Sequence, residues 1–250
     1  MGNILRQWRA GILLTTAAIT LLAACSRKEV QDVPPATTDA WVRPAHFPEP
    51  VYQFDDNAYS KASFELGRKL FFDPMLSRDG TISCASCHRQ KDAFADGGAA
   101  FSIGINGGIS KRNSPVLFNM AWNKSFMWDG GVNHIEVMPL APLTNPAEMG
   151  ESLVNIVRKL NNHPDYPSLF KKVFNRDTVD DQQMFWALAQ YMSGLVSANA
   201  RYDQYVNGTA YLTPDEQEGL LLFRQHCASC HSEPLFTDYS YQNNGIDKVF

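Results

Sequence analysis

The sequence predicts a mainly α-helical fold, and three observations support this prediction. Apolar residues recur at three- and four-residue spacing in several segments, as they do along one face of a helix. Helix start and stop signals flank these segments. No alternating run of apolar and polar residues, typical of a half-buried strand, extends beyond a few positions. With 250 residues and 44% hydrophobic composition, the chain can form one large domain or two modest ones.

The first two expected helices are amphipathic. In residues 60–72, apolar side chains recur every four residues, and Asp73-Pro74 ends the pattern because a proline disfavours the helical conformation of the residue before it. In residues 151–162, the apolar side chains form one stripe with polar residues on the other faces. Both segments therefore predict a helix with one buried face.

Two later segments predict helices of different character. Residues 182–196 are apolar nearly all round, which predicts a buried helix. The next helix begins with Thr213 as N-cap, Pro214 at the first helical position and Glu216 completing a capping box. Residues 97–115, in contrast, are glycine-rich and lack a period, which predicts a long loop of the kind that often carries function.

The first 25 residues are typical of an export signal. Two arginines precede an apolar run, residues 11–24, that is too short to span a bilayer comfortably. The run ends in Leu-Ala-Ala-Cys25, which resembles the lipobox of bacterial lipoproteins and implies acylation of Cys25. The expected location is the periplasm or cell envelope, with a lipid anchor as the only membrane contact. The alternative is an ordinary signal anchor in which Cys25 is incidental.

A proline-rich segment follows, at residues 26–50. Because proline fixes φ and removes a backbone donor, this segment is expected to be an extended tether rather than a packed element. The net charge of the chain is −4, and basic residues form no cluster larger than a pair. No nucleic-acid partner is therefore expected.

The pentapeptide CASCH occurs twice, at residues 84–88 and 227–231, and the copies contain all the cysteines apart from Cys25. A four-thiolate zinc site usually has roughly 15–20 residues between its cysteine pairs, far fewer than here. A thioredoxin-like dithiol expects a βαβ context, which the pattern lacks. Covalent c-type haem needs two thiols for the two vinyl groups and a following histidine for the iron. The sequence therefore predicts two haem c groups, attached at Cys84 and Cys87 and at Cys227 and Cys230, with His88 and His231 as iron ligands.

Further motifs surround the two copies. They are ELGRKLFFDPMLSRDG, KRNSPVLFN, FMWDGG, NPAEMG and LTPDEQEGLLLFRQH. In this order, from about residue 60 to the end, they resemble the bacterial di-haem cytochrome c peroxidase family. That family includes the di-haem enzyme that matures the tryptophylquinone of methylamine dehydrogenase. The resemblance implies a mainly α fold of two cytochrome c-like haem domains with long loops.

The resemblance also implies that the two haems have different roles. The N-terminal haem of the family reduces hydrogen peroxide to water, and the C-terminal haem receives electrons from a small cytochrome c or cupredoxin. Family chains continue well past the end of this sequence, so the second domain is expected to be truncated. The expected organisation is a lipoprotein signal peptide at 1–25, a tether at 26–50, a peroxidatic haem domain at 51–200 and the start of an electron-entry haem domain at 201–250.

Three residues take roles from the resemblance. Trp128 matches the tryptophan between the haems, with Met127 replacing the preceding phenylalanine; the alternative is a core tryptophan. Glu148 matches the distal acid, which can move a proton between the peroxide oxygens; the alternative is a carboxylate favoured at a helix N-terminus. Asn113 matches an oxygen ligand of an inter-domain calcium ion; the alternative is a turn-forming asparagine.

The sequence departs from the family at two further positions. Ile105 stands where some members carry a histidine that caps the peroxidatic iron, so the first iron is expected to be open. Met138 stands where members often have a glutamine near the distal pocket, and core packing is its expected role.

The expected function is a cytochrome c peroxidase whose partners are hydrogen peroxide and a small electron-donor protein. A homodimer is a further partner compatible with the family. One alternative is a di-haem oxidase that uses peroxide to act on a protein or organic substrate. Another is a non-enzymatic electron carrier, which would need neither an open iron nor a distal acid.

Overall fold

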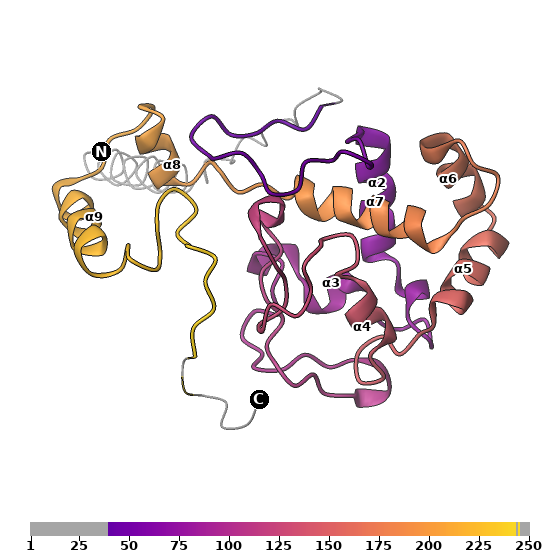
Figure 1. The fold of residues 1–250 in the computed structure, drawn as a ribbon. Helices are drawn as coiled ribbons and strands as arrows, with labels where there is room; N and C mark the ends of the chain where they lie inside the picture. The colour runs from indigo at the N-terminus through magenta and orange to yellow at the C-terminus, as the bar shows by residue number, and fades with distance from the viewer. Residues whose placement is uncertain (1–39, 244, 246–250) are drawn as a thin grey trace, which may run out of the picture. The chain divides into compact units, whose positions relative to one another are not determined.

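The structure, a computed structural model, describes residues 40–243 and residue 245, and their fold is mainly α-helical as the sequence predicts (Figure 1). Cys25 and the predicted signal peptide lie outside the described residues. The helices are α2 (Lys61–Phe72), α3 (Cys84–Cys87), α4 (Leu140–Thr144), α5 (Leu153–Asn162), α6 (Tyr166–Phe174), α7 (Asp181–Gly194), α8 (Arg201–Val206) and α9 (Pro214–His226). Short 3-10 turns lie at Pro74–Leu76, Gln90–Asp92, Ile105–Gly107 and Met120–Trp122. Between residues 40 and 243, β-pairing is limited to three isolated bridges.

Helices α2 and α7 pack directly on each other. The N-cap of α2 is Ser60, whose hydroxyl accepts from the backbone N–H of Ser63, and the helix ends at Asp73 as predicted. Helix α7 is buried along most of its length, which confirms the prediction for residues 182–196. Gly67 lies where the helices cross, and a Cβ added there would come within 1.9 Å of the backbone oxygen of Ala187. The two backbones therefore touch with no side chain between them.

A single large core surrounds this crossing. Helices α5 and α6 contribute Ile156, Leu160, Tyr166 and Phe170, each at most 1% exposed. Ile156 and Leu160 belong to the buried stripe that the sequence predicts for residues 151–162, whereas Tyr166 and Phe170 lie on α6, which the sequence pattern does not predict. The irregular segments between α3 and α4 belong to the same core, to which they contribute Phe94, Leu117, Met120, Phe126, Ile135 and Met138.

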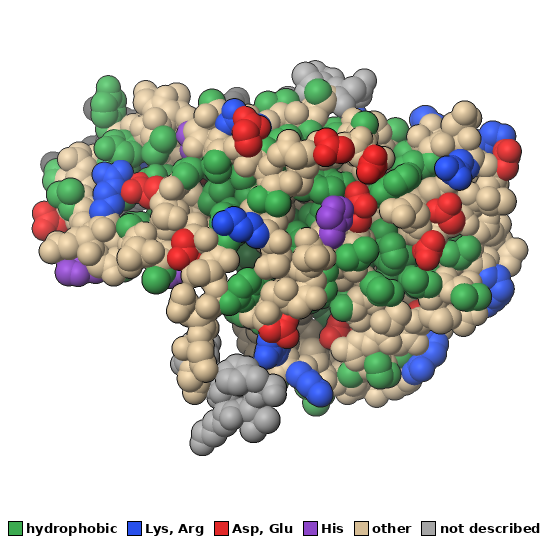
Figure 2. Space-filling model, in the orientation of Figure 1, with side chains coloured by type: hydrophobic (Ala, Val, Ile, Leu, Met, Phe, Trp, Pro, Cys, Tyr) green, Lys and Arg blue, Asp and Glu red, His purple; other side chains and the backbone are tan. Residues whose placement is uncertain are grey.

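Helix α9 begins with the predicted capping box at Thr213 and Glu216. None of its residues is buried, although its apolar side chains include Leu221, which is 62% exposed. Figure 2 shows hydrophobic side chains open to solvent on the lobe that contains α8 and α9. Glu233 connects the two helices, because its carboxylate accepts from Arg224 on α9 and from the Tyr202 hydroxyl on α8.

The end of the predicted tether differs from the expectation. Residues 40–50 are described, and they pack on the domain instead of extending away from it. Phe47 is 3% exposed and meets the Trp122 ring edge-on at 5.1 Å, and Trp122 donates through Nε1 to the Pro48 oxygen at 2.8 Å. Proline limits the backbone conformation, but burial of the aromatic side chains decides where this segment lies.

His46 is also buried, although it lies in the segment that the sequence predicts to be an extended tether. Its Nε2 lies 2.9 Å from Oδ1 of Asp203 on α8, and the two side chains are only 7% and 9% exposed. Asp203 accepts a further hydrogen bond from the Ala200 N–H at 2.8 Å. This contact fastens residues 40–50 to α8, which lies more than 150 positions later in the chain.

The α2–α7 crossing predicts opposite effects of alanine at two helical glycines. Gly67→Ala should destabilise the protein, because its Cβ would collide with the Ala187 backbone. Gly219→Ala on α9 has open space around it and should be neutral or stabilising by up to about 1 kcal/mol. Thermal unfolding of both variants measures this difference. Equal melting temperatures would contradict the close backbone contact.

The buried His46–Asp203 contact predicts a cost well above that of a surface pair. His46→Ala leaves a buried carboxylate without this partner, which should lower the free energy of unfolding by about 1–3 kcal/mol. Glu49→Ala removes an exposed pair with Arg43 and should cost about 0–1 kcal/mol. Denaturant titrations compare the two variants. A loss for His46→Ala no larger than that for Glu49→Ala would show that the contact adds little.

Candidate functional site

The first CASCH copy forms one helical turn, α3. Ser83 caps this turn, and its N–H donates to the hydroxyl of Ser86 at 3.1 Å. The backbone N–H of His88 donates to the oxygen of Cys84 at 2.9 Å, which closes the turn. Both thiols and the imidazole thus come from a single turn, as haem attachment requires. None of the four cysteines in the described part of the chain forms a disulfide.

The His88 ring is oriented by two backbone carbonyls. Its Nδ1 lies 2.7 Å from the oxygen of Phe94 and 3.1 Å from the oxygen of Pro115. Because carbonyl oxygens only accept, Nδ1 must carry the proton, and Nε2 keeps its lone pair for a metal. Burial lowers the pKa of His88, which favours the neutral imidazole that binds iron.

The two thiols of this copy are kept protonated. Burial raises the pKa of Cys84 to about 12. Burial also raises the pKa of Cys87, and the charges of Asp96 and Glu148 add to that effect. Glu148 is thus one of the charges that act on Cys87 in the first attachment turn.

The second CASCH copy repeats this geometry beyond the five identical residues. Cys227 ends α9, and Nδ1 of His231 lies 3.0 Å from the oxygen of Phe236. Phe94 and Phe236 both have left-handed backbone conformations, with φ of 59° and 57°. Each copy is therefore followed by a loop whose phenylalanine carbonyl turns back to orient the histidine. The sequence shows the pentapeptide repeat, but this longer structural repeat depends on backbone geometry.

The residues present fit covalent haem in both copies. In the first, the turn supplies two thiols and an imidazole with a free Nε2. In the second, Cys227 and Cys230 are exposed, and apolar side chains of the same part of the chain are also uncovered, among them Leu222 and Phe236 at 49% and 37% exposure. A porphyrin would cover apolar surface of this kind.

The loop at residues 97–115 connects the predicted site residues of the first domain. The N–H of Ile105 donates to the oxygen of Glu148 at 2.8 Å, and Trp128 donates through Nε1 to the oxygen of Asn113 at 2.7 Å. A Cβ at Gly104 would lie 2.2 Å from the oxygen of Ala147, so only glycine allows this close approach. The loop therefore holds the Glu148 and Trp128 segments together.

Glu148 is half-buried, and its carboxylate accepts from Nδ2 of Asn145 at 2.8 Å. Burial raises its pKa, and the hydrogen bond from Asn145 offsets part of this effect. A carboxyl group with a raised pKa can hold and release a proton near neutral pH more readily than an exposed one. Asn145 is not among the site residues predicted from the sequence, although it lies three residues before Glu148 in the NPAEMG motif.

Trp128 and Asn113 lie at the surface of the described residues. Trp128 is 55% exposed, so it is not the core tryptophan that was the alternative to a bridging role. Asn113 uses Nδ2 to donate to the oxygen of Ala99 at 2.6 Å. Met138 is 8% exposed and belongs to the core, as the sequence predicts. No group of three or more histidine, cysteine or acidic side chains among the described residues could hold a metal ion.

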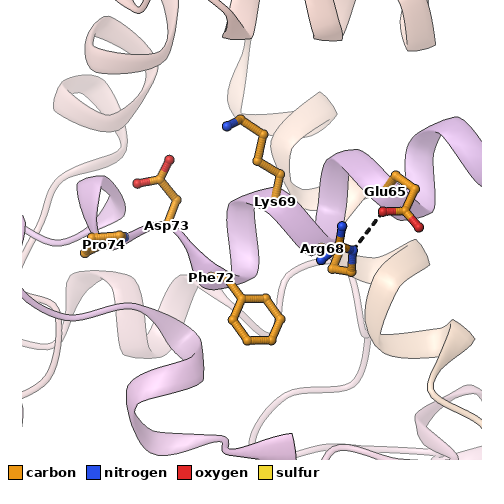
Figure 3. Close-up of a pocket in the computed structure, with 6 residues that line it drawn as sticks. All are labelled: Glu65, Arg68, Lys69, Phe72, Asp73 and Pro74. Atoms are coloured by element: carbon orange, nitrogen blue, oxygen red, sulfur yellow. Dashed lines mark hydrogen bonds and ion pairs between the residues drawn. The ribbon is translucent and has the colours of Figure 1, made fainter.

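A surface hollow at the end of α2 lies apart from these residues (Figure 3). Glu65, Arg68, Lys69, Phe72, Asp73 and Pro74 line it. Its charged groups have partners within the fold: Arg68 donates to Glu65 at 2.7 Å, and Asp73 accepts from the Tyr166 hydroxyl at 2.6 Å. None of the predicted site residues lines this hollow.

Two haem-attachment turns on a helical frame define a c-type di-haem protein. A model of the family described as di-haem cytochrome c peroxidase matches residues 61–211. The methylamine utilization protein MauG of Methylorubrum extorquens is 34% identical over 203 residues, covering 80% of this chain and 57% of the relative. Cytochrome c551 peroxidase of Nitrosomonas europaea is 35% identical over 188 residues, covering 74% of this chain and 56% of the relative. The chain belongs to the di-haem cytochrome c peroxidase family.

A solved structure supports the same fold. The crystal structure of a MauG-like protein associated with microbial copper homeostasis superimposes with a TM-score of 0.72 at 32% identity, covering 81% of this chain and 62% of that one. The chain spans little more than half the length of the two curated relatives above. Haem c is the cofactor that the family implies. No helix among residues 40–243 has the length and hydropathy needed to cross a membrane.

The raised pKa of Glu148 predicts a pH-dependent contribution to stability. Folding favours its protonated form, so its contribution is full below the ordinary value of 4.5 and is lost as pH rises through the folded pKa. Glu148→Gln should therefore raise the melting temperature at neutral pH and have little effect below about pH 4. Thermal unfolding at both pH values measures this difference.

Glu151 is the matched control, with the opposite sign. Its burial alone would raise its pKa, but hydrogen bonds from Lys159, Ser152 and Asn155 hold the pKa below its ordinary value. Glu151→Gln should lower the melting temperature at neutral pH, and this loss should fade in acid. If the Glu148 variant showed the same sign as the Glu151 variant, burial would not govern the pKa of Glu148.

Proposed function

We propose that the protein is a di-haem peroxidase that reduces hydrogen peroxide to water with electrons from a small cytochrome c or cupredoxin. The observation that carries this proposal is the half-buried Glu148 carboxyl, in a segment that the loop at residues 97–115 joins to His88 through the hydrogen bonds of Ile105 with Glu148 and of His88 with Pro115. A protein that only carries electrons would not need an acid at this position, because electron transfer alone moves no proton between substrate atoms. When bound, the first haem supplies the iron that takes up peroxide and passes electrons to it.

Glu148 is proposed to move the proton that this reaction needs. Reduction of peroxide to water requires a proton to leave one peroxide oxygen and reach the other, and a carboxyl group in hydrogen-bond reach performs such a transfer. Asn145 donates to the carboxylate and so fixes its orientation. The backbone contact from Ile105 holds the acid at its place in the fold, and the side chain of Ile105 is buried. This arrangement supports a first haem site open to peroxide.

Trp128 is proposed to carry electrons between the two haem groups. The indole is exposed at the edge of the first domain and is oriented by its hydrogen bond to the oxygen of Asn113. Asn113 is proposed as a calcium ligand through its carboxamide oxygen, since its amide nitrogen is engaged with Ala99. The proposed domains are 51–200 for the peroxidatic haem and 201–250 for electron entry.

The cellular location and the assembly of the protein are also proposed. The lipobox-like sequence supports acylation at Cys25 and attachment to the periplasmic side of a membrane. Attachment of two haems and electron delivery by a small redox protein fit that compartment. A homodimer is proposed as the assembly to test.

A peroxide-dependent oxidase is the second candidate function. The MauG name of one relative and the MauG-like description of the solved structure support it. Such an enzyme would need the same attachment turns and the same acid, and would differ in its final electron source, a protein or organic substrate. Turnover of peroxide with reduced cytochrome c, compared with turnover that requires an organic co-substrate, separates the two functions.

Replacing Glu148 tests the proposed acid. Glu148→Gln keeps the size of the side chain but removes its ability to exchange a proton, so peroxide turnover should fall about 10²–10⁴-fold. Covalent haem content, measured from absorbance after denaturation, should stay unchanged because the attachment turns are intact. Glu65→Gln on α2 is the control and should keep full turnover. An unaltered rate in Glu148→Gln would remove the residue from the mechanism.

A further inference from the structure

A largely buried carboxylate outside the predicted site residues, that of Glu136, accepts hydrogen bonds from two oxidisable rings. The Tyr52 hydroxyl donates to Oε1 of Glu136 at 2.7 Å, and Trp186 donates through Nε1 to Oε2 at 3.1 Å. Tyr52 is 9% exposed, and the Glu136 side chain is 13% exposed. One carboxylate thus accepts from a phenol and an indole, the two side chains that give up an electron most readily among the aromatic residues.

The phenol oxygen is held in place by a further network. Asn57 donates through Nδ2 to the Tyr52 oxygen at 2.9 Å, and Gln190 on α7 donates to Oδ1 of Asn57 at 2.7 Å. The phenol proton therefore has one direction open to it, toward Glu136. A distance of 2.7 Å lies within the range that proton transfer needs.

The electrostatic setting prevents Tyr52 from ionising in the resting protein. Burial, followed by the hydrogen bond to Glu136, raises its pKa far above the ordinary value of 10.0. The phenol therefore loses its proton only when an electron leaves at the same time. Glu136 is the base placed to take that proton.

A continuous run of aromatic contacts leads from the proposed iron ligand His88 to Tyr52. The successive ring centroids lie 6.5 Å (His88–Phe71), 5.0 Å (Phe71–Tyr191), 5.2 Å (Tyr191–Phe64), 6.3 Å (Phe64–Tyr59), 5.9 Å (Tyr59–Phe54) and 4.6 Å (Phe54–Tyr52) apart. Beyond Tyr52, the ring of His134 lies 5.7 Å away, and its side chain is 52% exposed. The run therefore joins the first attachment turn to the surface.

We propose that Tyr52 and Glu136 form a proton-coupled redox site that receives an oxidising equivalent from the first haem site. In this step, Tyr52 loses one electron and its O–H bond breaks. The proton passes to Oε1 of Glu136, which becomes a neutral carboxylic acid, and the electron reduces the haem site that hydrogen peroxide has oxidised. The product on Tyr52 is a neutral phenoxyl radical. This inference rests on the proposed peroxidase function.

Trp186 acts as a positioning residue in this site, since its N–H holds the second oxygen of Glu136. Because His134 is exposed, a reductant at the surface can reduce the Tyr52 radical through it. A small phenolic reductant that reaches His134 is one ring contact from Tyr52 and can return the electron. Glu136 then gives its proton back to the Tyr52 oxygen, and the proton lost by the oxidised reductant passes to solvent. The site would thus discharge oxidising equivalents when the protein donor is exhausted.

Electron paramagnetic resonance tests the proposal directly. The haem-loaded, full-length protein is mixed with hydrogen peroxide without an electron donor and is frozen within its first turnover. A tyrosyl radical is expected, and growth with ring-deuterated tyrosine should narrow its signal. Tyr52→Phe should lose the signal, whereas Tyr211→Phe, at a site that is 90% exposed, should keep it.

Glu136→Gln provides a second variant that keeps Tyr52 in place. Its amide oxygen still accepts the phenol hydrogen bond but cannot take up the proton, so the tyrosyl signal should fall. Circular dichroism and covalent haem content verify the fold of each variant. A full signal in folded Tyr52→Phe, or no tyrosyl signal in the unaltered protein, would overturn the inference.

Peroxide consumption in the same samples separates this inference from the proposed function. Consumption of peroxide without a radical at Tyr52 defeats the redox site alone. If the unaltered, haem-loaded protein consumes no peroxide with or without a donor, the peroxidase function fails, and the redox site fails with it.

Discussion

The backbone contact between α2 and α7 is the constraint on which the packing around the first attachment turn depends. Gly67 lets α2 approach the Ala187 backbone so closely that no larger residue fits between them. Because α2 leads into the first attachment turn, this contact sets where Cys84 and His88 lie relative to the core. The same α7 carries Trp186 and Gln190, which join the Glu136 network. One crossing of two helices thus positions both the haem-attachment turn and the proposed redox site.

Around this frame, the functional geometry is made by irregular backbone. The loop at residues 97–115 contacts Glu148, Trp128 and His88 through backbone atoms. Side chains at the site are therefore oriented mainly by carbonyl and amide groups, whose positions do not depend on side-chain rotamers. Such contacts are less sensitive to side-chain substitution than hydrogen bonds between side chains, with Gly104 as the exception, because the backbones meet there.

The two CASCH copies share a local geometry but differ in what surrounds them. The first lies against a large core, with its histidine half-buried. The second ends an exposed helix and leaves apolar side chains uncovered. The two identical CASCH copies therefore provide the same attachment chemistry in two different environments. For c-type haem, environment decides whether an iron meets solvent, substrate or a redox partner.

The sequence by itself determined helices α2, α5, α7 and α9, the two haem-attachment motifs and the family, but not the shorter helices α4, α6 and α8. Helix periodicity, caps and the CxxCH spacing all act over a few residues, so a linear reading contains them. The packing of residues 40–50, the His46–Asp203 contact and the Tyr52–Glu136–Trp186 cluster were decided only by tertiary structure. Each joins positions tens to more than a hundred residues apart. Their partners are chosen by burial of rings and by the need to pair buried polar groups, which no local pattern records.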